Sequence, residues 1–233
     1  MCRNIKHYPP PNKTRKVYVK PVPAPLKKLK KIDDDIKSLL TEVSKDNIKS
    51  SLLKLSSYHT RHSKSENINE VAEWLKNEFQ NMGYDDVLFH KYNETIEGNN
   101  YDLKNVICKK NGVNNKCILI CAHYDSRMKN LGDSISRSPG ANDNASGVSA
   151  ILEIARILYT HNLEYSLQFA LFSGEEQGLL GSTHYAQFVK ENNIDIYRLI
   201  NLDMIGYPQL NPGIVLIERD NHSDSEHNQV EEN

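Results

Sequence analysis

Residues 118–125, ILICAHYD, form an apolar run that ends directly in a histidine and an aspartate. The same arrangement recurs twice further along the chain, in 167–176 (LQFALFSGEE) and in 199–204 (LINLDM). Short apolar runs of this kind are typical of strands that are buried on both faces of a sheet. The sequence therefore predicts three buried strands, each of which runs into acidic residues.

Helices are predicted between these strands. Residues 148–158 carry apolar side chains on one helical face, and a second helix is expected over 178–191. Strands that alternate with helices favour a largely parallel sheet that is covered by helices. Upstream, 105–108 and 117–122 are expected to pair as a hairpin, because Asn111-Gly112 supplies turn residues between them. The expected fold class is α/β, with a mixed, mostly parallel sheet flanked by helices.

Two further helices are expected before the sheet. Apolar residues follow the acidic run 33–35 at helical spacing, from Ile36 to Val43. A clearer apolar stripe runs from Ile68 to Met82, and Gly83 stands where a left-handed helix end is expected.

The two ends of the chain differ in composition from its middle. Residues 1–31 hold ten basic side chains, several prolines and no acid, and are expected to be a disordered basic arm. This leaves 19 of the 29 basic residues against all 30 acidic ones, so the folded part is acidic. The expected domain spans 32–217, and 218–233 is expected to be an acidic disordered tail.

Composition also limits the class of protein. No run approaches the roughly 18 apolar residues of a membrane span, and residues 1–30 lack the apolar stretch of a secretory signal. We therefore expect a soluble protein, cytoplasmic by default, and leave its oligomeric state open. The excess of basic over acidic residues is confined to the arm, so nucleic acid is not an expected partner. The cysteines show no CxxC spacing and are expected to be free thiols: Cys2, Cys108, Cys117 and Cys121.

Acidic side chains gather at the carboxyl ends of the predicted strands, the edge at which open α/β sheets bind ligands. So many carboxylates in one place would repel one another unless cations neutralise them. Imidazole and carboxylate ligands together suit zinc, cobalt or manganese. The residues expected to meet there are His123, Asp125, Asp143, Glu175, Glu176 and Asp203.

Each of these residues also has an ordinary structural explanation. An aspartate before a helix, such as Asp143, is usually an N-cap, and Glu175-Glu176 alone would be a solvated pair. Asp203 is harder to explain in this way, because apolar residues surround it and burial of an unpaired carboxylate is costly. Their joint occurrence favours the metal site.

Four motifs in this order resemble the M28 zinc metallopeptidases, and within them the bacterial leucyl aminopeptidase type. The resemblance extends from about Leu53 to about Asp220 and implies an exopeptidase that removes N-terminal residues from peptide substrates with two zinc ions. The motifs are His123-Tyr-Asp125-Ser, Pro139-Gly-Ala-Asn-Asp143-Asn-Ala-Ser-Gly147, Ser173-Gly-Glu175-Glu176-Gln-Gly-Leu-Leu-Gly181-Ser and Asn201-Leu-Asp203-Met.

The resemblance implies a ligand set for both ions. Asp143 would bridge them, His123 and Asp203 would complete one ion's protein ligands, and Glu176 would bind the other. Two cations that share a water molecule lower its pKa and polarise the scissile carbonyl.

The resemblance also implies two roles beside the metals. Glu175 would act as the general base, and Asp125 would orient His123 from behind, as metal-bound histidines commonly require.

The family pattern includes one more histidine, several tens of residues beyond Asp203, as the last ligand of the ion held by Glu176. The later histidines of this sequence, His222 and His227, lie in polar surroundings. We therefore expect the domain to lack its C-terminal part.

One alternative is an inactive or weakly metal-binding fragment that acts as a binding module. Another is different chemistry on the same fold, such as that of glutaminyl cyclases or carboxypeptidases. Family members are often exported, although nothing in the sequence encodes export.

Overall fold

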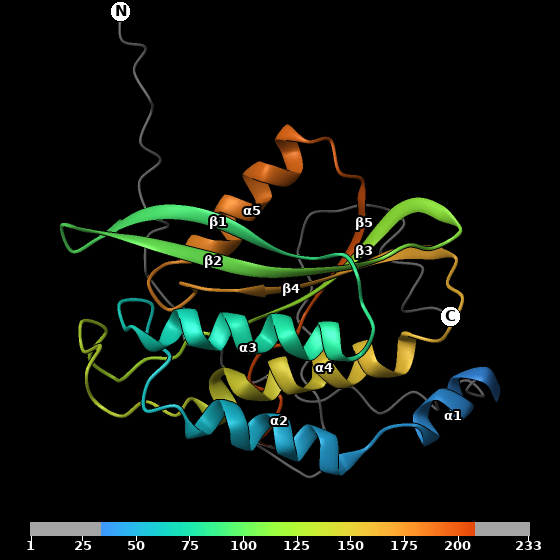
Figure 1. The fold of residues 1–233 in the computed structure, drawn as a ribbon, viewed down its shortest axis with the longest axis horizontal. Helices are drawn as coiled ribbons and strands as arrows, with labels where there is room; N and C mark the ends of the chain where they lie inside the picture. Colours follow the sequence, from blue (N-terminus) through green and yellow to red (C-terminus); the bar gives the residue numbers. More distant parts are fainter. Residues whose placement is uncertain (1–33, 208–233) are drawn as a thin grey trace, which may run out of the picture.

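A five-stranded sheet runs through the computed structural model, which describes residues 34–207 (Figure 1). The expected basic arm 1–31 and acidic tail 218–233 lie outside the described residues. The strands follow one another across the sheet in the order β1-β2-β4-β3-β5. They are β1 (Val87–Ile96), β2 (Asn99–Lys110), β3 (Asn114–His123), β4 (Tyr165–Phe172) and β5 (Ile196–Asn201).

Strand directions make the sheet mixed. β2 pairs antiparallel with both β1 and β4, whereas β3 pairs parallel with both β4 and β5. Four of the five described strands therefore run in one direction, with β2 opposed to them. The predicted fold class, a mixed and mostly parallel sheet flanked by helices, is confirmed.

The predicted hairpin between 105–108 and 117–122 is wrong, because β4 lies between β2 and β3. β4 is buried from Leu167 to Phe172, so a central place in the sheet covers both of its faces. β2 instead forms its hairpin with β1, through Glu97 and Gly98. Both turn residues have positive φ, the geometry that matches the twist of a tight hairpin.

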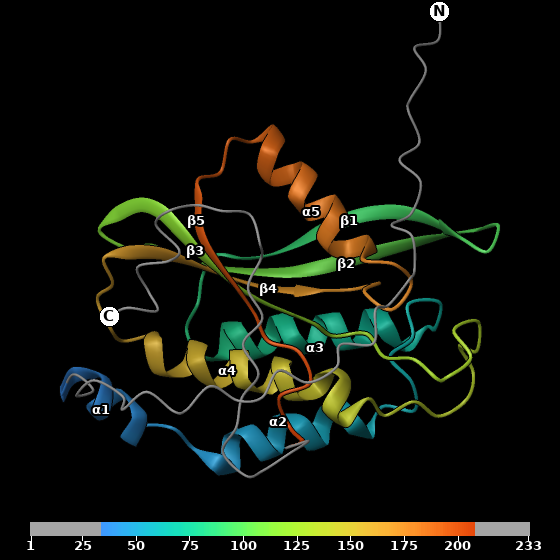
Figure 2. The same ribbon diagram turned by 180° about the vertical axis from the view of Figure 1, so that it is seen from behind.

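Helices cover both faces of the sheet, α2, α3 and α4 on one side and α5 on the other (Figures 1 and 2). The expected helix ending at Gly83 is confirmed as α3, and α2 was not predicted. Ser44 begins α2, since its hydroxyl accepts the backbone N–H of Asn47. The helices are α1 (Asp34–Thr41), α2 (Lys45–Ser57), α3 (Asn67–Asn81), α4 (Ser146–Leu158) and α5 (Leu180–Glu191), with a short irregular turn η1 (Ala141–Ala145) before α4.

Two apolar clusters hold the layers together. Alternate residues of a strand face opposite sides, so Phe169 packs toward α3 and α4 while Phe172 packs with Tyr185 of α5. The larger cluster lies on the side of α2, α3 and α4. The described cysteines, Cys108, Cys117 and Cys121, are buried free thiols, as predicted.

The strand at the β5 edge is more exposed than the sequence predicts. Within the sheet formed by residues 34–207, β5 is an edge strand, and Leu199 and Ile200 are 59% and 48% exposed. The expectation of three fully buried strands therefore holds for β4 and the second half of β3 but not for β5.

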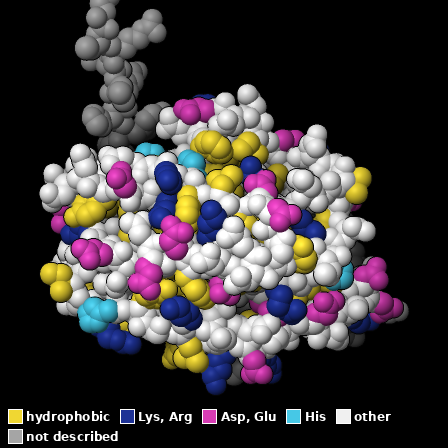
Figure 3. All heavy atoms as spheres, viewed as in Figure 1, with side chains coloured by type: hydrophobic (Ala, Val, Ile, Leu, Met, Phe, Trp, Pro, Cys, Tyr) yellow, Lys and Arg dark blue, Asp and Glu magenta, His cyan; other side chains and the backbone are white. Residues whose placement is uncertain are grey.

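The surface of the described residues carries both signs of charge. On the face seen in Figure 3, lysine and arginine side chains lie among aspartates and glutamates, with small apolar groups between them. None of the described helices is both long enough and apolar enough to cross a bilayer.

Candidate metal centre

The carboxyl ends of three parallel strands meet at one edge of the sheet. His123 is the last residue of β3 and lies opposite Phe172, the last residue of β4. Cys121 of β3 pairs in the same way with Asn201, the last residue of β5. The segments after the strands therefore start side by side. They carry Asp125 after β3, Glu175 and Glu176 after β4, and Asp203 after β5.

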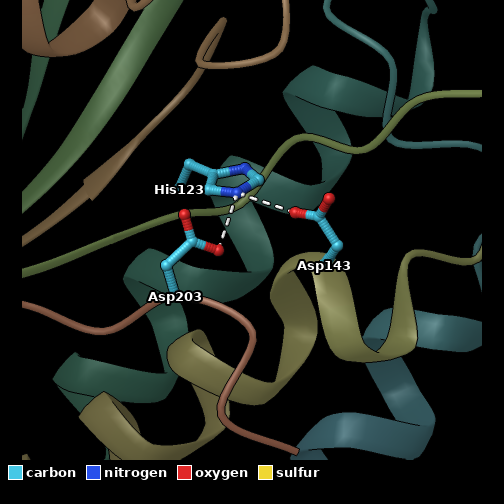
Figure 4. A group of neighbouring side chains, drawn as sticks. All are labelled: His123, Asp143 and Asp203. Atoms are coloured by element: carbon cyan, nitrogen blue, oxygen red, sulfur yellow. Dashed lines mark ion pairs between the residues drawn. The ribbon is translucent and has the colours of Figure 1, made fainter. Parts of the chain in front are cut away.

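Three side chains from three segments converge at this edge (Figure 4). The Nε2 atom of His123 lies 3.1 Å from Oδ1 of Asp143 and 3.7 Å from Oδ1 of Asp203. One ligand atom from each residue lies within 4.8 Å of the other two. Ligands bound tetrahedrally to zinc at about 2.0–2.1 Å would lie about 3.3 Å apart. One imidazole and two carboxylates at these distances fit a divalent cation.

The turn η1 brings Asp143 to Asp203. The side-chain amide of Asn144 donates to the carbonyl of Leu202 at 2.9 Å, and the backbone N–H of Met204 donates to Oδ1 of Asn144 at 3.3 Å. These bonds on both sides of Asp203 join its segment to the start of α4. The side chain of Asp203 is 36% exposed, so the expectation that apolar neighbours bury it is wrong. Because β5 is an edge strand, this segment is open to solvent.

Asp125 supports His123 from the opposite side. It is fully buried, and its Oδ1 lies 3.4 Å from Nδ1 of His123, beyond the length of a good hydrogen bond. Its two oxygens also accept the backbone N–H groups of Glu175 and Glu176, each at 3.1 Å. Asp125 therefore fixes the loop after β4 and faces the histidine nitrogen that is turned away from Asp143 and Asp203.

The cluster is strongly coupled in charge. Burial alone would lower the pKa of His123, but the nearby carboxylates of Asp125, Asp143 and Asp203 hold that pKa well above its usual value. The same contact with His123 lowers the pKa of Asp143. Burial, together with the neighbouring acids, raises the pKa of Glu175. A positive charge among these carboxylates is therefore favoured.

Glu176 does not join the three-residue cluster. Its carboxylate accepts a hydrogen bond from Nε of Arg127, and its side chain is 7% exposed. Burial and the charge of Asp143 raise the pKa of Glu176 to about 7, despite this contact. Sequence analysis missed Arg127. Its position could have indicated it, because Arg127 lies two residues after Asp125, in the segment that follows β3 at the edge where the acids gather.

Arg61 is a second residue that sequence analysis missed. It is fully buried and donates hydrogen bonds to the carbonyls of Leu55, Tyr124, Pro139 and Gly140, at 2.5–3.0 Å. Burial lowers its pKa to about 10, although the charges of Asp125 and Asp143 act in the opposite direction. Arg61 therefore joins the end of α2 to the segment after β3 and to the loop before Asp143.

Gly140 is needed where Arg61 meets this loop. Its φ of 49° lies in the left-handed region. A Cβ at this position would lie 2.8 Å from the guanidinium of Arg61, and closer still to the carbonyl of Asp143. The glycine thus allows the loop to approach Arg61 closely.

The sequence pattern of Peptidase family M28 matches residues 105–232. This match spans more than half of the chain and contains all six residues expected at the metal site. The chain belongs to peptidase family M28. In this chain, the four motifs identified in the sequence lie at the ends of β3, β4 and β5 and in the segments that follow these strands.

Relatives of this M28 chain include a probable zinc metalloprotease of Pyrenophora teres f. teres, which is 32% identical over 88% of this chain and 44% of that protein. Leucine aminopeptidase 1 of Paracoccidioides brasiliensis is 33% identical over 75% of this chain and 46% of that protein. The chain thus spans less than half the length of both relatives.

Solved structures show the same fold. The LapA aminopeptidase of Legionella pneumophila matches with a TM-score of 0.61 at 27% identity, over 78% of this M28 chain and 49% of that chain. A glutaminyl cyclase of Tannerella forsythia matches with a TM-score of 0.62 at 23% identity, over 70% of this chain and 62% of that chain. At that identity, the second likeness shows the fold alone.

Proposed function

We propose that this chain carries the catalytic site of a zinc-dependent aminopeptidase, which hydrolyses the N-terminal residue from peptides. The observation that carries the proposal is the cluster of His123, Asp143 and Asp203 at the carboxyl ends of parallel strands. Membership of family M28 and the aminopeptidase and zinc metalloprotease names of its relatives support the same activity.

His123, Asp143 and Asp203 would hold one zinc ion. Asp143 and Glu176 would contribute to a second, as the resemblance implies. Zinc, when bound, polarises a peptide carbonyl and lowers the pKa of the water that it binds to about 7. Asp125 would keep Nε2 of His123 directed at the ion, because the buried carboxylate faces Nδ1.

Glu175 is proposed as the general base. Its Oε2 lies 4.0 Å from Nε2 of His123, outside the three-residue cluster, and its side chain is 33% exposed. A carboxylate that binds no metal can take a proton from the attacking water and deliver it to the leaving amine. Its raised pKa suits both steps, since the group holds the proton between them.

The experiment that tests this function compares Glu175→Gln with the unaltered chain, both loaded with zinc, on a leucyl anilide. We expect kcat to fall about 10²–10⁴-fold while the zinc content stays the same. Glu164→Gln is the matched control, because Glu164 precedes β4 at the opposite end of the same strand.

Three outcomes would contradict the proposal. Loss of zinc in Glu175→Gln would place Glu175 among the ligands. A zinc-loaded chain that cleaves no aminoacyl anilide would favour a binding module. Cyclisation of a glutaminyl substrate in preference to leucyl hydrolysis would favour the alternative chemistry of the fold.

A further inference from the structure

We propose that Arg127 takes the place of a second cation at Glu176, so that a second zinc ion binds there only when this guanidinium is displaced. The inference rests on the proposed function, because it assumes that His123, Asp143 and Asp203 hold the first ion. It concerns the affinity and order of metal binding, which the family assignment does not determine.

The contact between Arg127 and Glu176 is the first observation. The Glu176 side chain is 7% exposed, and Nε of Arg127 donates to its Oε2. A carboxylate that is this well buried is costly without a positive partner. Among the described residues, Arg127 is the cation that contacts this carboxylate. Arg127 therefore supplies part of the positive charge that a metal ion would otherwise supply to Glu176.

The position of Glu176 is the second observation. Its backbone N–H is held by Oδ2 of Asp125 at 3.1 Å, so the backbone is fixed and the carboxylate is placed next to Arg127. A cation between Asp143 and Glu176 would lie beside the guanidinium, and two positive charges in a half-buried site repel strongly. Metal binding there therefore requires Arg127 to move. Its side chain is 35% exposed and has solvent to move into.

The charges around the site are consistent with a single ion. The two negative charges of Asp143 and Asp203 balance one divalent cation, and Glu176 is balanced by Arg127. Asp125 lies in the field of the buried Arg61. Glu175 then remains as the carboxylate available for proton transfer. A second divalent ion would add positive charge to a site whose metal-binding carboxylates are already neutralised.

The test is a zinc titration of the full chain by equilibrium dialysis, with bound metal measured per chain. We expect the unaltered chain to bind one ion tightly and a second weakly. Arg127→Gln should bind the second ion about two- to fivefold more tightly, the effect expected from removing one partly exposed ion-pair partner. The first ion should be unaffected. Lys129→Gln is the matched control, since it removes a positive charge from the same exposed loop, and it should leave both affinities unchanged.

Two further measurements locate the effect. The double variant Arg127→Gln/Glu176→Gln should lose the gain in second-ion affinity, because the ion gained is bound by Glu176. Without metal, Arg127→Gln should melt at a lower temperature than the unaltered chain, since Glu176 then lacks its partner. The same substitution thus weakens the metal-free protein and strengthens second-site binding, which a purely structural role would not produce.

The results that overturn the inference differ from those that overturn the function. Equal second-ion affinity in the unaltered chain and Arg127→Gln would reject the role of Arg127 and leave the proposed function intact. A gain that persists in the double variant would do the same. Failure of the unaltered chain to bind any zinc would reject both.

Discussion

The two sides of the candidate metal centre are built differently. On the side of His123, the histidine and its supports Asp125 and Arg61 are 4%, 0% and 0% exposed. On the other side, the side chains of Asp143 and Asp203 are 40% and 36% exposed. The buried side is positioned by the folded protein itself, whereas the open side consists of carboxylates that a cation would draw together. Folding and metal binding should therefore depend on different residues.

The largest expected effect tests the buried side. Arg61→Met would remove the guanidinium donor from four carbonyls, and with it a buried positive charge that interacts with Asp125 and Asp143. We expect the free energy of unfolding to fall by more than about 3 kcal/mol, measured by urea unfolding. Arg137→Met, at an exposed position, should change it by less than about 0.5 kcal/mol. Equal stability of the two variants would show that Arg61 does not hold the loops together.

A second prediction concerns the contact between the two sides. Asp125→Asn keeps the shape of the side chain but removes the charge that faces Nδ1 of His123. We expect zinc affinity at the first site to fall about 10–100-fold, with little loss of secondary structure by circular dichroism. Asp85→Asn, at an exposed position before β1, is the control. Unchanged zinc affinity in Asp125→Asn would mean that the histidine is held by other contacts.

The smallest expected effect concerns the pH dependence of folding stability at Glu153, a residue of α4 that lies outside the metal centre. Glu153 of α4 accepts hydrogen bonds from the N–H of Ser44 and from Arg156. Burial alone would raise its pKa, but these bonds hold the pKa below its usual value. A lowered pKa in the folded state stabilises the protein above the unfolded-state pKa of about 4.5. This stabilisation is lost as the pH falls below that value. Glu153→Gln should therefore flatten the acid limb of the stability curve of the metal-free chain. A limb of unchanged slope would assign the acid dependence to other groups.

The sequence predicts the fold well wherever the apolar pattern of a single segment is enough to identify it as a helix or a strand. The stripe of α3 and the continuous apolar run of β4 fix their elements locally, and the acids that follow parallel strands share an edge because the strands do. The hairpin prediction failed because Asn111-Gly112 is a local signal, whereas β4 has to enter between β2 and β3 to bury both of its faces.

The residues missed at the site share one property: their partners are far away in the sequence. Arg61 contacts carbonyls up to 79 residues away, and Arg127 contacts Glu176 49 residues away. Neither pairing leaves a periodic trace in the sequence. The exposure of Asp203 was misjudged for a related reason. Its apolar neighbours predict burial, but β5 lies at the edge of the sheet, which local hydrophobicity does not reveal.

The most direct test of the central claim is the zinc content of the purified chain, measured beside that of His123→Ala. His123 supplies the nitrogen ligand that lies next to both Asp143 and Asp203. We therefore predict at least one zinc ion per chain in the unaltered protein and loss of that ion in the variant. A chain without zinc, or a His123→Ala variant that keeps all of its zinc, would contradict the assignment of this edge of the sheet as a metal centre.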